Sequence, residues 1–180
     1  ERKPSEKHVI TYTYYIIMGE ILRSWLKQSA PMDPGLDAML NLLVASRFVE
    51  SDFEEMLSGF GITRRQYNVL RFLKGAYPGG HPRSEIASRV VEQSPDITRI
   101  IDRLSEQGLI TRSKGKKDKR ESLTIITQKG IEIVEKIAPL VTAFMKNIEN
   151  TLTKEGCLTL SELCEKLYEE KIMNFQEQNK

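Results

Sequence analysis

Residues 81–127 read HPRSEIASRVVEQSPDITRIIDRLSEQGLITRSKGKKDKRESLTIIT, and this stretch decides the fold. Apolar side chains at helical spacing predict one short helix around Ile86 and a second from Ile97 to Leu104. The run Gln-Ser-Pro at 93–95 lies between them and is typical of a turn. Two helices joined by a turn and followed by a hairpin are the elements of a winged helix-turn-helix, whose second helix fits the major groove of DNA. The sequence therefore predicts a DNA-binding module.

A basic β-hairpin is predicted directly after the second helix. Residues 109–112 and 122–126 have strand patterns, and residues 114–119 form the tip between them. Lysines at such a tip suit phosphate contacts, which add affinity without sequence information, and arginine suits the negative potential of the minor groove. Alone, a basic loop is more typical of a solvated turn, but directly after a helix-turn-helix we favour DNA contact. The wing residues expected at the DNA are Arg112, Lys114, Lys116, Lys117, Asp118, Lys119 and Arg120.

The outward side of the second helix carries residue types that read bases. Ser94 can cap this helix and Pro95 suits its first position, where free backbone N–H groups favour phosphate. Arginine pairs with guanine, threonine bonds a base or a phosphate, and aspartate accepts from cytosine. Asp96 would also stabilise the first turn without touching a base. The expected major-groove residues are Ser94, Pro95, Asp96, Thr98, Arg99 and Arg103.

Composition limits the class of protein. The 180 residues are 39% apolar and 29% charged, which suits one folded core with helical arms. The net charge is only +2, so the basic charge is local, concentrated between Ile110 and Arg120, and the segment 149–180 is acidic. No apolar run approaches the roughly 20 residues that span a bilayer, and no signal-peptide pattern is present. Two cysteines are too few for a disulfide scaffold, so we expect a cytoplasmic protein without membrane contact.

Further helices are predicted on both sides of the helix-turn-helix. Thr63 and Gln66 have the spacing of a capping box at the start of one of them. Pro139 lies inside another and is expected to kink it. The predicted helices run from Ile10 to Trp25, from Leu36 to Leu57, from Thr63 to before Tyr77, from Thr127 through Ile148, and from Thr153 to Phe175.

Three motifs together resemble the MarR family of bacterial transcription regulators. They are SPDITRIIDRLSEQGLITR at 94–112, DKR at 118–120 and LTIITQKG at 123–130, within a resemblance that covers Ile62 to about Pro139. The resemblance implies a mainly helical protein that forms a homodimer on a pseudo-palindromic DNA operator. It also implies a repressor released by a small aromatic or phenolic ligand. It further implies that Asp118 steadies Arg120 in the wing, and that Ser94, Asp96, Thr98 and Arg99 form the major-groove face.

Four regions are therefore expected. They are an N-terminal helical arm over 1–35, a dimerisation helix over 36–61, a winged helix-turn-helix domain over 62–130 and C-terminal dimerisation helices over 131–180. Candidate ligand contacts are Trp25, Arg47, Phe48 and Tyr67. Aromatic residues at helical spacing are more often core or dimer contacts, and a lone arginine is more often solvated or in a salt bridge, so we favour those interpretations for Trp25 and Arg47.

Cys157 and Cys164 lie seven residues apart on one helix face, about 10 Å apart along the axis, so they cannot form a disulfide within that helix. With Leu160 and Leu167 they have the spacing of a helix seam, so we expect small buried thiols. A redox switch across a dimer is the alternative. The peroxide-sensing branch of the family uses a cysteine in the helix that corresponds to Leu36–Leu57, and this chain has none there.

Enzymatic activity is not expected. The sequence contains no recognisable nucleophile–base pair, glycine-rich phosphate loop or carboxylate cluster, and no Cys or His spacing typical of a metal site. We therefore expect no catalytic residues, no metal and no cofactor. The remaining alternatives are a winged helix that binds protein instead of DNA, and a thiol-redox-responsive regulator.

Overall fold

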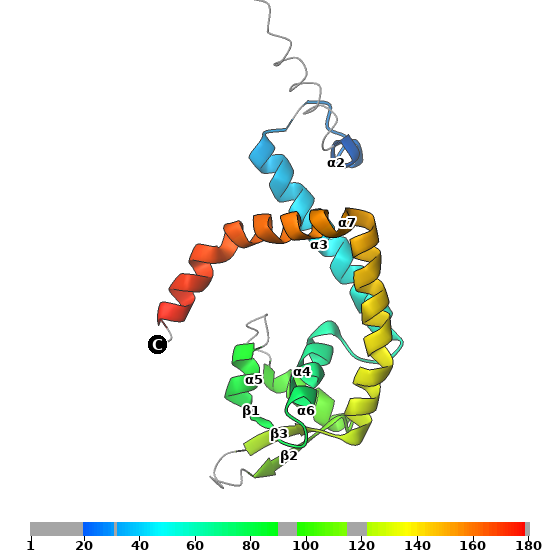
Figure 1. The fold of residues 1–180 in the computed structure, drawn as a ribbon, viewed down its shortest axis with the longest axis vertical. Helices are drawn as coiled ribbons and strands as arrows, with labels where there is room; N and C mark the ends of the chain where they lie inside the picture. The colour runs from blue at the N-terminus through cyan, green and yellow to red at the C-terminus, as the bar shows by residue number, and fades with distance from the viewer. Residues whose placement is uncertain (1–19, 31, 90–96, 115–121, 179–180) are drawn as a thin grey trace, which may run out of the picture. The chain divides into compact units, whose positions relative to one another are not determined.

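The computed structural model describes residues 20–30, 32–89, 97–114 and 122–178. The chain divides into two compact units, residues 1–53 and residues 54–180. The helices are α2 (Glu20–Trp25), α3 (Pro34–Ser58), α4 (Arg64–Gly75), α5 (Arg83–Arg89), α6 (Ile97–Glu106) and α7 (Gln128–Gln178), and the strands are β1 (His81–Pro82), β2 (Ile110–Lys114) and β3 (Ser122–Ile126). The expectation of a mainly helical protein with a small hairpin sheet is confirmed (Figure 1). No helix in these ranges is long and apolar enough to cross a membrane.

In the first unit, the predicted helix Leu36–Leu57 is confirmed as α3, which begins two residues earlier and ends one residue later. Asp33 starts it by accepting a hydrogen bond at Oδ1 from the backbone N–H of Gly35, 2.9 Å away. The predicted helix Ile10–Trp25 is represented by α2 at its C-terminal end, and the rest of that prediction lies outside the described residues. The rings of Trp25 and Phe48 pack with centroids 6.1 Å apart.

In the second unit, α4 begins with the predicted capping box. Thr63 Oγ1 accepts from the backbone N–H of Gln66, and the Thr63 N–H donates to Gln66 Oε1 at 2.9 Å. These two bonds satisfy donors that a helix start would otherwise leave unpaired. The inward side of α4 is completely buried and forms the centre of the core. Its buried apolar residues are Tyr67, Val69, Leu70 and Leu73.

The helix-turn-helix is formed by α5 and α6. On α6, Ile100, Ile101 and Leu104 are buried, whereas Ile97 is only half-buried. Gly108 follows α6 with φ of 71°, a conformation that suits glycine, so the predicted helix end is confirmed. The predicted turn at 93–95 lies outside the described residues.

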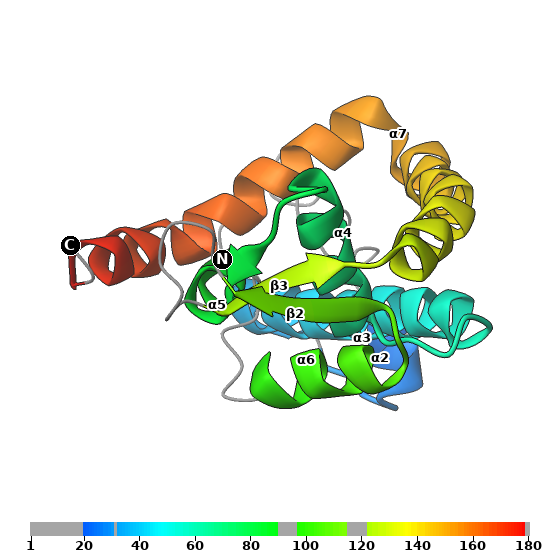
Figure 2. The ribbon, with the colours of Figure 1, turned by 90° about the horizontal axis from the view of Figure 1, so that it is seen from below.

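The sheet has the order β1-β3-β2, with both pairings antiparallel. Figure 2 shows β2 and β3 side by side. Arg112 in β2 pairs with Thr124 in β3. The predicted return strand is confirmed at Ser122–Ile126, but β2 runs from Ile110 to Lys114 instead of 109–112. The sequence analysis did not predict β1, because two residues carry no periodic pattern.

The long helix α7 contains one sharp change of direction. Thr127 caps its start, because its Oγ1 accepts from the N–H of Gly130 at 3.2 Å. The backbone leaves helical angles only at Thr153, where φ is 64° and ψ is 163°. The expected kink at Pro139 is thus not where α7 breaks, while the predicted new helix from Thr153 is confirmed by this break (Figure 1). Thr153 Oγ1 then accepts from the N–H of Gly156 and so caps the second half.

Gly130 lies where α7 meets the hairpin. A Cβ atom at this position would collide with the carbonyl oxygen of Leu109 and would lie 2.7 Å from Ile126 Cγ1. Leu109 and Ile126 are both buried, so neither neighbour has open space to move into. The close approach of α7 to the hairpin therefore requires glycine here.

Replacing Gly130 with alanine is expected to destabilise the protein by about 1–3 kcal/mol, the usual cost of overpacking. Gly156→Ala is the matched control, because its Cβ would have no neighbour closer than 3.6 Å. This second change should be neutral or stabilising by up to about 1 kcal/mol, since alanine favours helices. Urea denaturation of both variants measures the difference, and equal effects would contradict the packing argument.

Candidate DNA-binding surface

The outward side of α6 is the centre of the candidate surface. Thr98, Arg99 and Arg103 are exposed on it, while the opposite side of the helix fills the core. A helix held by its apolar side against a hairpin and two other helices presents its polar side in a fixed direction. This arrangement matches the expected role of these three residues. Ser94, Pro95 and Asp96 lie outside the described residues and remain predictions.

Arg83 joins this surface from α5, and the sequence analysis missed it. Its Nη1 donates a hydrogen bond to Thr98 Oγ1 at 3.2 Å. The two residues line one shallow pocket together with Ser122 of β3. Arg83 is the first residue of α5, so a basic residue at the start of the first helix of the pair was the signal available in the sequence. The hydrogen bond fixes the position of the Thr98 hydroxyl and places the positive charge of Arg83 beside it.

The helix α5 is held in place by an interaction that does not involve DNA. His81 Nδ1 lies 2.8 Å from Glu85 Oε2. The imidazole ring stacks on Phe72 of α4 with ring centroids 4.2 Å apart. Arg89 lies over the other partner of this stack, 6.0 Å from the Phe72 centroid. These contacts join α4, β1 and α5, and so fix the element that carries Arg83.

The wing is joined to α6 by an ion pair. Arg112 Nη2 lies 2.5 Å from Asp102 Oδ1, and both side chains are about half-exposed. Arg112 therefore holds the hairpin against α6, whatever contact it makes with DNA. The tip residues Lys116, Lys117, Asp118, Lys119 and Arg120, and the side chain of Lys114, lie outside the described residues. Their DNA contacts remain predictions.

The candidate ligand contacts fall in both units. In the first unit Trp25 and Phe48 are brought together, and both side chains are more than half exposed. Arg47 is exposed next to Phe48 on α3. Tyr67 belongs to the second unit, where burial raises the pKa of its phenol above 10.0 although Arg71 and Lys74 act to lower it. No observation within either unit assigns these residues to a ligand.

Both cysteines are free thiols. Buried thiols were expected, but Cys157 and Cys164 are half-buried in the single chain, because the surrounding face of α7 is exposed there. Within the described residues, no group of three or more His, Cys, Asp or Glu side chains could hold a metal ion.

Comparison with known proteins agrees with this geometry. A model of the MarR family matches residues 62–122, from the residue before the capping box to the first residue of β3. The chain belongs to the MarR family. It is 28% identical over 128 residues to the HTH-type transcriptional regulator FarR of Neisseria gonorrhoeae, which covers 71% of this chain and 86% of FarR.

Two solved structures share the fold at low sequence identity. The first is MepR of S. aureus in complex with DNA, at 20% identity and a TM-score of 0.65, covering 73% of this chain and 96% of MepR. The second is Bordetella bronchiseptica BpsR, whose DNA binding is regulated by 6-hydroxynicotinic acid. It has 19% identity and a TM-score of 0.65, and the match covers 77% of this chain and 97% of BpsR. This MarR-family chain is a DNA-binding transcription regulator, and family membership places it outside the enzymes, as expected.

Replacing Arg83 or Thr98 with alanine is expected to weaken DNA binding, and the two effects are expected to be coupled. Since the residues share a hydrogen bond, the double variant should lose less than the sum of the single variants, by about 0.5–3 kcal/mol. Fluorescence-anisotropy titration of the four proteins with one DNA duplex measures the coupling. Pairing Arg83→Ala with Lys136→Ala on α7 provides an additive control, and additivity for Arg83 and Thr98 would exclude the positioning role.

Proposed function

We propose that this protein is a homodimeric repressor that acts in the cytoplasm, binds a pseudo-palindromic operator and is released by a small aromatic ligand. The observation that carries the proposal is the outward side of α6, where Thr98, Arg99 and Arg103 are presented beside the hairpin. Two such helices in a dimer would enter successive major grooves about 34 Å apart. Regulation then follows from any change in that spacing.

Base reading is assigned to α6 and backbone anchoring to the wing. The proposed readers are Asp96, Thr98, Arg99 and Arg103, with Ser94 and Pro95 presenting the helix start to phosphate. The proposed anchors are Arg112, Lys114, Lys116, Lys117, Lys119 and Arg120, with Asp118 orienting Arg120. Because Thr98, Arg99 and Arg103 lie on α6 and Arg112 lies on β2, within a MarR-family helix-turn-helix and hairpin, a winged helix without DNA binding is not favoured.

Dimerisation is assigned to the second half of α7. A run of apolar side chains is exposed there, and exposed apolar stripes of this length mark interfaces. Cys157 and Cys164 lie in the same segment and would be covered with it. The exposed apolar residues are Leu158, Leu160, Leu163, Leu167, Tyr168, Ile172 and Met173.

Release by an aromatic ligand is supported by two observations. DNA binding by the structural relative BpsR is regulated by 6-hydroxynicotinic acid. In this chain, Trp25 and Phe48 form an aromatic pair whose rings are more than half exposed, with Arg47 adjacent in sequence. A ligand carrying an aromatic ring and an acid group fits such a set of side chains. Such a ligand changes the distance between the two α6 helices of the dimer only if it binds one arrangement of the dimer more tightly than the other.

The operator duplex is first selected from a random pool of sequences. The protein should bind both this operator and a random-sequence duplex, and both affinities should depend steeply on salt concentration. Each phosphate contact contributes a log–log slope of roughly −0.9. Changing Lys116, Lys117 and Arg120 together to alanine should weaken both duplexes alike and make the slope shallower. Arg99→Ala should weaken the operator more than the random duplex. Anisotropy titrations at several salt concentrations test this, and identical behaviour of the two variants would contradict the division between anchor and reader.

The same titration tests the effector. Added 6-hydroxynicotinic acid should weaken operator binding and change the emission of Trp25, which is the single tryptophan of the chain. Trp25→Phe should abolish the emission change. An emission change without any loss of DNA affinity would separate ligand binding from regulation.

A charge placed on the exposed apolar stripe of α7 is expected to produce monomers. Leu167 is 65% exposed in the single chain, so Leu167→Asp should leave the monomer folded while it prevents burial in a dimer. Lys166→Asp is the matched control, since Lys166 lies next to it and pairs with Glu162 on the polar side of the helix. Sedimentation velocity reports the mass, and a dimeric Leu167→Asp variant would move the interface elsewhere.

A further inference from the structure

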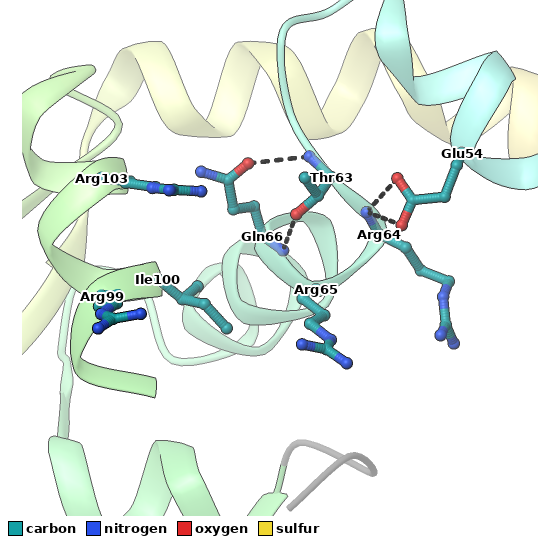
Figure 3. Close-up of a pocket in the computed structure, with 8 residues that line it drawn as sticks. All are labelled: Glu54, Thr63, Arg64, Arg65, Gln66, Arg99, Ile100 and Arg103. Atoms are coloured by element: carbon teal, nitrogen blue, oxygen red, sulfur yellow. Dashed lines mark hydrogen bonds between the residues drawn. The ribbon is translucent and has the colours of Figure 1, made fainter. Parts of the chain in front are cut away.

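A groove of about 320 Å³ lies between the start of α4 and the side of α6. Four arginines line it, two from each helix, together with one carboxylate from the end of α3 (Figure 3). In Figure 3 the side chains of Arg99 and Arg103 extend from α6 toward the start of α4, and those of Arg64 and Arg65 extend from α4 toward one open side. The sequence analysis assigned no role to Arg64, Arg65 or this groove.

The charge of the groove favours an anion. Among the residues that line the groove, the four arginines Arg64, Arg65, Arg99 and Arg103 and the one carboxylate Glu54 sum to a formal charge of +3. The Glu54 carboxylate lies at the helix start, where its two oxygens accept from the backbone N–H of Arg64 at 3.1 and 3.2 Å. Guanidinium groups bind phosphate oxygens through paired hydrogen bonds, which a single ammonium group cannot do.

The position of the groove points to DNA as the source of that anion. Arg99 and Arg103 are four residues apart, so they lie one turn apart on the side of α6 that faces α4. Thr98 lies on the other side, where it contacts Arg83 of α5. A helix in the major groove has a phosphate backbone along each of its sides. One flank of α6 therefore carries Arg83, and the other carries the four-arginine groove.

We propose that this groove binds a backbone phosphate of DNA beside the reading helix, with Arg64 and Arg65 as additional anchors and Glu54 as a carboxylate that weakens the contact. The inference rests on the proposed placement of α6 in the major groove. Arg65 and Arg64 contact the backbone from α4, so they add affinity without reading sequence. Arg99 and Arg103 add their positive charge from the side of α6. These two arginines therefore contact both the DNA backbone and the bases.

The Arg64→Ala/Arg65→Ala double variant is expected to lose affinity for operator and random duplexes by the same factor. Its log–log salt slope should be shallower than that of the wild type by roughly 0.9 for each phosphate contact removed. The control is Lys136→Ala/Lys146→Ala, which removes two positive charges from exposed positions on α7 and should leave the slope unchanged. Circular dichroism establishes that each variant is folded, and Arg65→Lys, which keeps the charge, should retain the wild-type slope.

Glu54→Gln gives a test with the opposite sign. The glutamine Oε1 still accepts from the Arg64 N–H, so the start of α4 remains capped, while the negative charge is removed. Affinity for both duplexes should rise. An unchanged affinity would show that Glu54 acts only as a cap and that the groove does not meet DNA.

The outcomes separate this inference from the proposed function. Wild-type protein that binds no DNA at any salt concentration would overturn the proposed function itself. Wild-type binding with an unchanged slope in the Arg64→Ala/Arg65→Ala variant would overturn only the groove. A loss confined to the operator would also overturn it, because a phosphate contact cannot distinguish sequences.

Discussion

The junction between the end of α6, the hairpin and the start of α7 is the constraint on which the candidate surface depends. The N–H of Thr127 donates to the carbonyl oxygen of Leu109 at 3.0 Å. The Thr127 hydroxyl donates to the carbonyl oxygen of Gly108 at 2.8 Å. Lys129 Nζ donates to the Gln107 carbonyl oxygen at 2.8 Å. Gly130 allows the backbones to approach this closely. The start of α7 thereby satisfies the backbone carbonyl groups of residues 107–109, which connect α6 to β2.

Around that junction, four polar residues of α6 have neighbours on three other elements. Thr98 is held by Arg83 of α5, Asp102 by Arg112 of β2, and Arg99 and Arg103 share a groove with the start of α4. The surface is thus composed of three helices and a strand. In the proposed complex with DNA, the residues that read bases would thus be positioned by arginines whose own charge suits the DNA backbone.

The sequence predicted what depends on local pattern. The helices α3, α4 and α6, the capping box and the strand β3 follow from apolar spacing and from residues next to one another in the chain. Arg83 and Arg65 were missed because their importance depends on contacts 15 and more residues away, which no periodicity records. A kink was expected at Pro139, where the backbone keeps helical angles, whereas the new helix expected from Thr153 begins where Thr153 adopts a positive φ that is unusual for a β-branched residue.

The shared core sets where regulation has to act. Ile131, Val134 and Ile137 of α7 are buried with α4 and the hairpin, so the first half of α7 and the helix α6 belong to one packed body. Packed cores resist continuous deformation. A ligand that moved α6 relative to α7 would therefore have to disrupt the core that joins them. A ligand that changes the spacing of two reading helices in the proposed dimer therefore does so by moving whole DNA-binding bodies relative to each other. Its binding energy needs to differ between two arrangements of the dimer, not between two shapes of this core.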